Sequence, residues 1–298
     1  MYLKDKRMQA LYLCCISTFF SVVCLSISDT KMDTPQIFAP GVISTSHEFG
    51  ITFTPDGKEL YFSRFDGKNP IHIFHAAMMN GIWQQPERVA FSSDQWSDLD
   101  PFLSPNGKQL FFISTRPVPG TPAGSKNMDI WVSSLEAGGW GNPRWLERVN
   151  SSGKEGSPTV DRAGNLYFFS DRAGGPDHNM IYEAAFSGGA YAEPVPLPAP
   201  VNSGTSDTSP FISPDGNSLL FYSTRSGGFG KADLYIALKK NGKWSEVKNL
   251  GPKVNTPDSE YNPAVSPNGK ILFFGRNSNI YEVPVSAVPA LKSNWFSR

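Results

Sequence analysis

The chain has 298 residues with 27 basic and 27 acidic side chains, so its formal net charge is zero. A protein without excess positive charge cannot neutralise many phosphates, which argues against nucleic acid as a partner. The 27 glycines and 25 prolines indicate a chain rich in turns. The length suits one or two ordinary domains, although all-β barrels and propellers use it as one.

Residues 1–28 have the pattern of a secretory signal peptide. A basic start precedes an almost wholly apolar run from Met8 to Ile27, and Ser26 and Ser28 form a small-x-small cleavage site. The alternative is an uncleaved membrane anchor, because the run is about long enough to cross a bilayer. Polar residues inside the run favour cleavage. We therefore expect a secreted or periplasmic protein with no membrane span after cleavage.

All three cysteines of the chain lie in this segment, at Cys14, Cys15 and Cys24. The predicted exported body, residues 29–298, therefore contains no cysteine. It can carry neither a disulfide nor a thiol nucleophile nor a thiolate metal site, and its stability must come from packing.

Five copies of one hairpin pattern follow, with turns that read TPDG, SPNG, DRAG, SPDG and SPNG. In such a turn Pro pre-sets the backbone, Asp or Asn tolerates a left-handed conformation, and Gly completes the reversal. The third copy departs from the pattern because it lacks the proline. The turn glycines recur every 50 to 57 residues, at Gly57, Gly107, Gly164, Gly216 and Gly269.

Each copy predicts three strands, and the first four copies also predict a fourth. The first precedes the turn, and the second is the short apolar run after it, as in Leu219–Tyr222. We expect the third strands at Ile71–His75, Asp129–Ser133, Met180–Ala184, Asp233–Ala237 and Asn279–Val283. The fourth is announced by an aromatic residue, a proline three positions on and an apolar residue three further on, at Trp83-Pro86-Val89, Trp140-Pro143-Leu146 and Tyr191-Pro194-Leu197, with a looser copy at Trp244-Val247-Leu250.

Four-stranded units of about fifty residues, repeated along the chain, are typical of a β-propeller. The copies predict an all-β, single five-bladed propeller of antiparallel blades over 29–298, with a sixth blade only if the C-terminal tail adds one. The last copy lacks its fourth strand, and Met32, Pro35 and Phe38 repeat the missing spacing. We therefore expect residues 35–43 to close the ring. The predicted blades cover 44–91, 92–149, 150–201, 202–254 and 255–284.

The repeated Ser-Pro-Asp-Gly turn, its apolar strand and the following Asp-Ile-Trp or Asp-Leu-Tyr resemble the WD40-like propeller repeat of TolB-type proteins. The resemblance covers about residues 44 to 284. It implies an exported propeller and is specific for the fold. It does not select a function, because such repeats occur in periplasmic scaffolds and in the propeller domains of peptidases.

An acid opens the first strand of every copy, and an arginine ends every second strand. The hairpin geometry makes them cross-strand neighbours on one face, near one mouth of the central channel. One interpretation is structural, since each blade would use its pair to fix the hairpin. The other is a ligand site for a metal ion, an amine or a sugar. The acids are Glu48, Asp98, Glu155, Asp207 and Glu260, and the arginines are Arg64, Arg116, Arg172, Arg225 and Arg276.

A specific site is expected where the copies differ. Aromatic rings beside acids can stack on a sugar or an organic cation. Asp94, Asp98 and Asp100 could help to hold a calcium ion, although the glycine of the twelve-residue calcium loop is missing. The differing positions at the predicted channel-mouth site are His47, Trp96, Asp100, Lys154 and Tyr261.

Two functions remain open on these residues. The first is a non-catalytic propeller that binds a protein or carbohydrate ligand at its loop-rich channel mouth. The second is a carbohydrate-active enzyme that uses two carboxylates at that mouth, as glycoside hydrolases do. No Gly-x-Ser-x-Gly, His-Glu-x-x-His or phosphate-loop motif appears in the sequence. No catalytic residue is assigned, and no cofactor is predicted beyond the calcium ion.

Overall fold

The computed structural model describes residues 33–291, except positions 46, 69, 119, 121–126, 174–177 and 204–205. The predicted signal peptide and its three cysteines lie outside the described residues. Within the described part, no helix is long and apolar enough to cross a membrane. The two short 3₁₀ turns η1 (Val285–Ala287) and η2 (Pro289–Leu291) follow the last strand.

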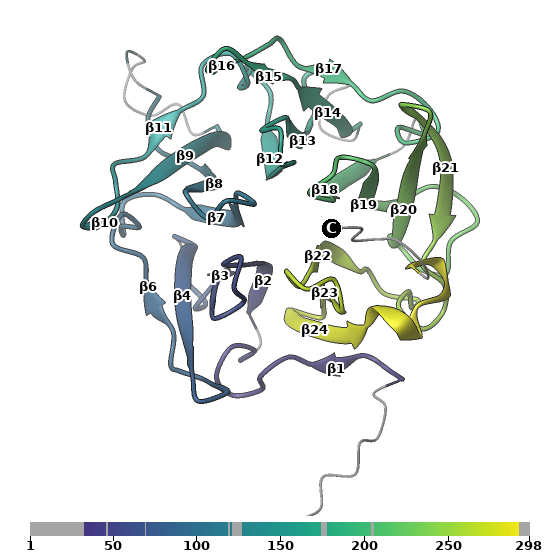
Figure 1. The fold of residues 1–298 in the computed structure, drawn as a ribbon, viewed down its shortest axis with the longest axis horizontal. Coiled ribbons are helices and arrows are strands. Elements are labelled where there is room, and N and C mark those ends of the chain that lie inside the picture. Colours follow the sequence, from purple (N-terminus) through teal and green to yellow (C-terminus); the bar gives the residue numbers. More distant parts are fainter. Residues whose placement is uncertain are drawn as a thin grey trace, which may run out of the picture. The chain divides into compact units, whose positions relative to one another are not determined.

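Residues 33–291 form a ring of five antiparallel sheets, which confirms the predicted five-bladed propeller (Figure 1). Blade 1 contains β2 (Glu48–Phe53), β3 (Glu59–Arg64), β4 (His72–Met79), β5 (Ile82–Trp83) and β6 (Glu87–Arg88). Blade 2 contains β7 (Asp98–Leu103), β8 (Gln109–Ser114), β9 (Asp129–Glu136), β10 (Gly139–Trp140) and β11 (Arg144–Trp145).

Blade 3 contains β12 (Glu155–Val160), β13 (Leu166–Ser170), β14 (Met180–Ala184) and β17 (Val195–Pro196), with the ribbon β15 (Phe186–Ser187) and β16 (Ala190–Tyr191) beside it. Blade 4 contains β18 (Asp207–Ile212), β19 (Ser218–Ser223), β20 (Asp233–Lys240) and β21 (Lys243–Asn249). Blade 5 contains β22 (Tyr261–Val265), β23 (Ile271–Arg276), β24 (Asn279–Pro284) and the N-terminal β1 (Gln36–Ile37). In each blade the first strand is the innermost (Figure 1).

Strand β1 pairs antiparallel with β24, with Gln36 opposite Glu282 and Ile37 opposite Tyr281. The pairing is shorter than the predicted closing segment 35–43, because only two residues share the ladder. Beyond it, the amide of Phe38 donates to the carbonyl of Ile280 at 2.8 Å. That this contact is what holds the ring closed stays a prediction, tested in the Discussion.

The outer strands show how one proline changes a blade. In blades 1 and 2 the outer segment contains Pro86 or Pro143, and it pairs only as two dipeptides on either side of that proline. In blade 4 Val247 stands at the same place and pairs with Ala237, and β21 is one strand of seven residues. Proline has no amide hydrogen for the ladder, so it interrupts a strand that valine continues.

The core lies between the blades. Because successive side chains of a strand point to opposite faces, each apolar second strand packs against both neighbouring blades. In β3, for example, Tyr61 joins the cluster shared with blade 2, whereas Phe62 joins the cluster shared with blade 5. The other three blade interfaces each hold a cluster of the same kind.

Candidate functional site

The five predicted acids lie at the start of the inner strands and are buried, with exposed fractions of 0% or 1%. Each forms an ion pair with the arginine that follows its own blade's hairpin. The shortest nitrogen–oxygen distances are 2.8 Å for Glu48–Arg64, 2.7 Å for Asp98–Arg116, 2.9 Å for Glu155–Arg172, 2.8 Å for Asp207–Arg225 and 2.8 Å for Glu260–Arg276.

The arginines also connect neighbouring parts of the ring, as Arg225 illustrates. Its guanidinium lies over the rings of Phe221 and Tyr235, with distances of 5.0 and 4.9 Å to the ring centroids. It donates to the carbonyl of Val201 at 2.6 Å, in the segment that arrives from blade 3. The remaining arginines donate to the carbonyls of Val42 and Ile43, Phe91, Val149 and Val254 in the equivalent connections.

The acids have further partners in the same connections. Glu48 accepts hydrogen bonds from the amide and hydroxyl of Thr45 at 2.7 and 2.5 Å. Ser151, Ser203 and Thr256 donate in the same way to the acids of blades 3, 4 and 5. In blade 2, Asp98 instead accepts from two nitrogens of Arg116, at 3.2 and 2.7 Å. These contacts occupy carboxylate oxygens and favour the structural interpretation of the pairs.

The other predicted positions differ from one another in exposure and in contacts. His47 is exposed, with its ring 6.1 Å from that of Phe65, and Lys154 is also exposed. Trp96 is half-buried. The Tyr261 hydroxyl accepts from the amide of Ser278 at 3.2 Å, and burial raises the pKa of that tyrosine. The prediction that these residues bind a ligand stays a prediction.

The three carboxylates of the predicted calcium site have separate partners. Asp94 is 78% exposed in its side chain and pairs with Arg88 at 2.5 Å. Asp98 is held by Arg116. Asp100 accepts from Ser157 and Asn262. Among the described residues, no three His, Cys, Asp or Glu side chains form a group that could hold a metal ion.

Asp100 belongs to a polar ring halfway along the channel. The third residue of every copy, counted from the acid, has a positive φ of 46° to 61°, where the ladder of the inner strand shifts register. These bulges bring together side chains from different blades around a cavity of about 30 Å³. The ring consists of Gly50, Asp100, Ser157, Ser209 and Asn262.

Two hydrogen bonds hold the Asp100 carboxylate across this ring, from Ser157 Oγ at 2.7 Å and from Asn262 Nδ2 at 3.0 Å. Burial raises the pKa of Asp100, and these two hydrogen bonds oppose that effect. The sequence singled out Asp100 as a departure, but the ring itself was missed. A sequence signal for the ring did exist: the residue two positions after each acid is either small or able to adopt a left-handed backbone conformation.

A larger cavity, about 650 Å³, lies at the other end of the inner strands, where the five turns meet. Pro55, Pro105, Pro214 and Pro267 from four of the turns form part of its wall. Phe102 and Phe211 lie 5.9 Å apart edge to face and border both this cavity and the small polar one. They therefore separate the two spaces. This cavity is at the opposite end of the channel from the acids and arginines.

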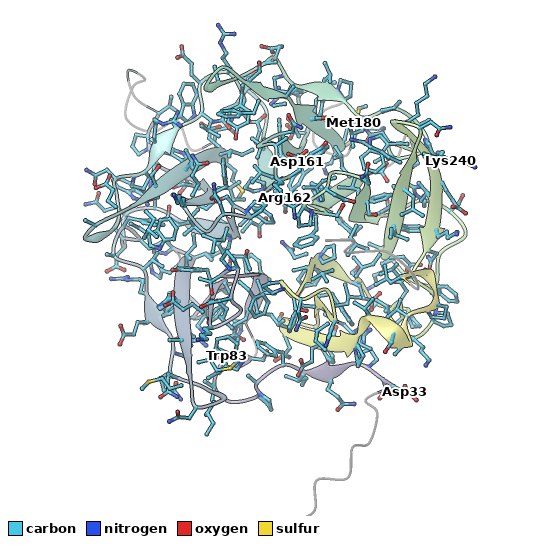
Figure 2. The ribbon with its side chains drawn as sticks, in the orientation of Figure 1. Asp33, Trp83, Asp161, Arg162, Met180 and Lys240 are labelled. Atoms are coloured by element: carbon cyan, nitrogen blue, oxygen red, sulfur yellow. The ribbon has the colours of Figure 1, made fainter. Side chains whose placement is uncertain are left out.

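The turn of blade 3 gives this cavity its most distinctive side chain. Asp161 and Arg162 stand where other copies have Ser or Thr and Pro. Asp161 accepts from the amide and side chain of Asn165, and the amide of Arg162 donates to the carbonyl of Pro214 at 2.8 Å. The Arg162 side chain is exposed and lies toward the middle of the ring (Figure 2). It also lines a second cavity of about 260 Å³, whose wall includes Phe186 and Tyr191.

Asp129 and Asp233 begin the third strands of blades 2 and 4 and occupy the same place in the repeat. Burial raises the pKa of Asp129 to about 6; a hydrogen bond from Trp145 opposes this effect, and the nearby charge of Glu155 adds to it. The Asp233 carboxylate instead accepts three hydrogen bonds, from the amides of Phe229 and Gly230 and from Asn249. The two aspartates should therefore respond in opposite ways to the same substitution.

We expect Asp129→Asn to raise the free energy of unfolding at pH 7 by about 1 kcal/mol. Between about pH 4 and 6 the folded protein binds the proton of Asp129 more tightly than the unfolded chain does, so wild-type stability falls as pH rises through that window. The advantage of the variant should vanish near pH 4. Urea unfolding at a series of pH values measures it.

Asp233→Asn is the matched control, because an amide cannot accept from all three donors as a carboxylate does. It should lower the free energy of unfolding at pH 7 by about 2 kcal/mol. Equal effects of the two substitutions would contradict the different environments that the structure gives these aspartates.

No family model matches this chain, and no curated protein matches it. Among solved structures it is similar to TolB from Acinetobacter baumannii, with a TM-score of 0.51 and 19% identity over 80% of this chain and 54% of that one. A structure from Agrobacterium tumefaciens assigned to TolB has a TM-score of 0.50 and 17% identity over 77% and 69%. An endo-arabinase from Bacteroides thetaiotaomicron has a TM-score of 0.53 and 16% identity over 84% and 97%.

These likenesses confirm, for the fold, the resemblance to TolB-type propellers. The chain spans about half the length of the Acinetobacter TolB. A TolB and an endo-arabinase match it about equally well, so the likeness describes a propeller and not an activity.

Proposed function

We propose that this chain is an exported, non-catalytic binding propeller, and that its ligand binds in the cavity where the five turns meet. The observation that carries the proposal is this cavity of about 650 Å³, which lies within the usual size range of small-molecule sites. Phe102 and Phe211 supply an aromatic floor, and charged groups are confined to a few positions of the wall. Export rests on the signal-peptide pattern of residues 1–28.

The contacts of the acids support binding over glycoside hydrolysis. A glycosidase needs one carboxyl group that can donate a proton and a second that can act as nucleophile or base. Each of the five acids at the opposite mouth is instead paired with its own arginine. Their carboxylate oxygens accept hydrogen bonds from these arginines and from neighbouring hydroxyl and amide groups, so they are held by the fold and not presented to a substrate.

Binding of the neutral fluorescent probe N-phenyl-1-naphthylamine tests the proposal. The probe should bind the purified protein, and Phe211→Ser should weaken binding about tenfold, because the substitution removes aromatic surface from the cavity floor. Fluorescence titration gives the dissociation constant, and thermal unfolding checks that the variant is folded.

The matched control is Phe229→Ser. Phe229 is 49% exposed and lies in the connection between β19 and β20, at the acid end of the channel. Binding to this variant should equal that of the wild type. Loss of binding in Phe229→Ser but not in Phe211→Ser, or no binding to the wild type, would show that the proposed site is wrong.

A further inference from the structure

The cavity of about 650 Å³ where the five turns meet, named the turn-end cavity from here on, carries an excess of positive charge on its wall. Arg162, Lys270 and Asp215 are the charged residues that line it. Within the described residues, neither Arg162 nor Lys270 takes part in an ion pair. The wall therefore contains two cationic side chains and one acidic side chain.

That acid is held within its own turn. Asp215 accepts hydrogen bonds from Ser213 Oγ at 2.5 Å and from the amide and side chain of Asn217 at 3.1 Å. Burial by itself would raise the pKa of Asp215, but these hydrogen bonds outweigh burial and lower it. The neighbouring Asp161 is likewise held by Asn165. Both carboxylates are thus engaged with partners other than Arg162.

Two further polar side chains of the wall form hydrogen bonds within their own turns. Ser104 Oγ donates to Asn106 Oδ1 at 2.8 Å and accepts from the amide of Gln109. Asn268 Oδ1 accepts from Ser266 and from the amide of Lys270. The wall offers apolar contact and two unpaired cations.

Arg162 could bind an anion in either of two cavities, because it lines both. Arg162 lines both cavities: the 650 Å³ cavity also has Phe102 and Phe211 in its wall, and the 260 Å³ cavity has Phe186 and Tyr191. The rings of Phe186 and Tyr191 lie 5.0 Å apart. A guanidinium in the wall of a cavity that also has aromatic side chains suits a ligand whose anionic group is attached to a bulky apolar body.

We propose that the turn-end cavity binds a small molecule with an apolar body and one anionic group, and that the Arg162 guanidinium binds the anion. This inference rests on the proposed function, because it specifies the ligand class of the same cavity. It assigns a role to the position at which the third turn departs from the Ser-Pro-Asp-Gly pattern.

Two probes with the same aromatic body test separately whether the cavity binds an apolar molecule and whether Arg162 binds its anionic group. N-phenyl-1-naphthylamine is neutral, and 8-anilino-1-naphthalenesulfonate carries one sulfonate. We expect the anionic probe to bind about tenfold more tightly, and Arg162→Gln to abolish that preference while leaving the neutral probe unchanged. Arg162→Lys should retain part of the preference, because it keeps the charge but not the fork of donors. Isothermal titration gives both affinities and the stoichiometry.

Arg148→Gln is the matched control, because Arg148 is exposed and lines neither cavity. It should leave both affinities unchanged. Equal affinities for the two probes, or an equal loss of both in Arg162→Gln, would overturn the role of Arg162 while leaving the binding cavity in place. If neither probe binds, the proposed function fails as well. The inference would also be refuted if Arg162→Gln preferred the anionic probe as strongly as the wild type does.

Discussion

Replacing Asp98 with alanine is expected to lower the free energy of unfolding by about 3–5 kcal/mol. The substitution leaves Arg116 with its charge in the interior, where its side chain is only 10% exposed, and without the two hydrogen bonds that the carboxylate accepts. Arg116 also lies over the ring of Phe112 and donates to the carbonyl of Phe91, so its displacement would loosen the junction between blades 1 and 2. Urea unfolding followed by tryptophan fluorescence measures the loss.

Removing the whole pair should be less harmful than removing one partner. Asp98→Leu with Arg116→Met should recover most of the lost stability, because no charge is then left without a partner. Glu246→Ala serves as a surface control: Glu246 pairs with Lys248 at 2.8 Å, both side chains are about half exposed, and the change should cost less than about 0.5 kcal/mol. A stable Asp98→Ala variant that loses ligand binding would contradict the structural interpretation and support a site at the acid mouth.

The repeats explain why the fold could be predicted. Each copy carries its own turn, its own apolar strand and its own acid and arginine. The strands predicted for one copy therefore predict the strands of the others. Both faces of every second strand are buried, which is why runs such as Leu219–Tyr222 are continuously apolar and not alternating. Blade number followed from counting copies.

The details of pairing were harder to predict because they depend on the bulges. In blade 4 Asp207 lies opposite Ser223 and the ladder shifts between Thr208 and Phe211. In blade 1 the ladder shifts at the equivalent place, and Glu48 lies directly opposite Arg64, because this arginine stands two positions earlier in the repeat than Arg225 does. Ion pairs of similar length form in both cases, since the arginine side chain spans the difference. Likewise, the break in an outer strand depends on a single residue, as the contrast of Pro143 with Val247 shows.

The turn-end cavity could not be located from the sequence for a different reason. Its wall is made by residues more than two hundred positions apart, from Thr52 to Lys270, and the turns look like ordinary connections one at a time. Phe102 and Phe211, which border both cavities, come from different blades, and their contact cannot be inferred from either copy alone. The only local signal was the loss of the proline at Arg162, which marks the one turn with a long cationic side chain at that position.

Phe38→Ala is expected to lower the free energy of unfolding by about 3–5 kcal/mol, and it tests whether the N-terminal strand closes the ring. Phe38 is 6% exposed and belongs to the cluster between blades 5 and 1. Its ring lies 5.0 Å from that of Phe273 and 6.0 Å from that of Trp83, so it contacts both blades. Truncation would leave a cavity at the junction, which urea unfolding at pH 7 would register as a loss of stability.

Two controls separate ring closure from simple loss of a phenylalanine. Ile37→Ala changes the neighbouring residue, which is 38% exposed, and Phe229→Ala removes an exposed ring elsewhere; each should change stability by about 0.5 kcal/mol or less. If the strand closes the ring, the amide of Phe38 should exchange its hydrogen only on global unfolding, because its partner is the carbonyl of Ile280 in β24. Fast exchange there, with unchanged stability of Phe38→Ala, would mean that the ring is held by the blade interfaces alone.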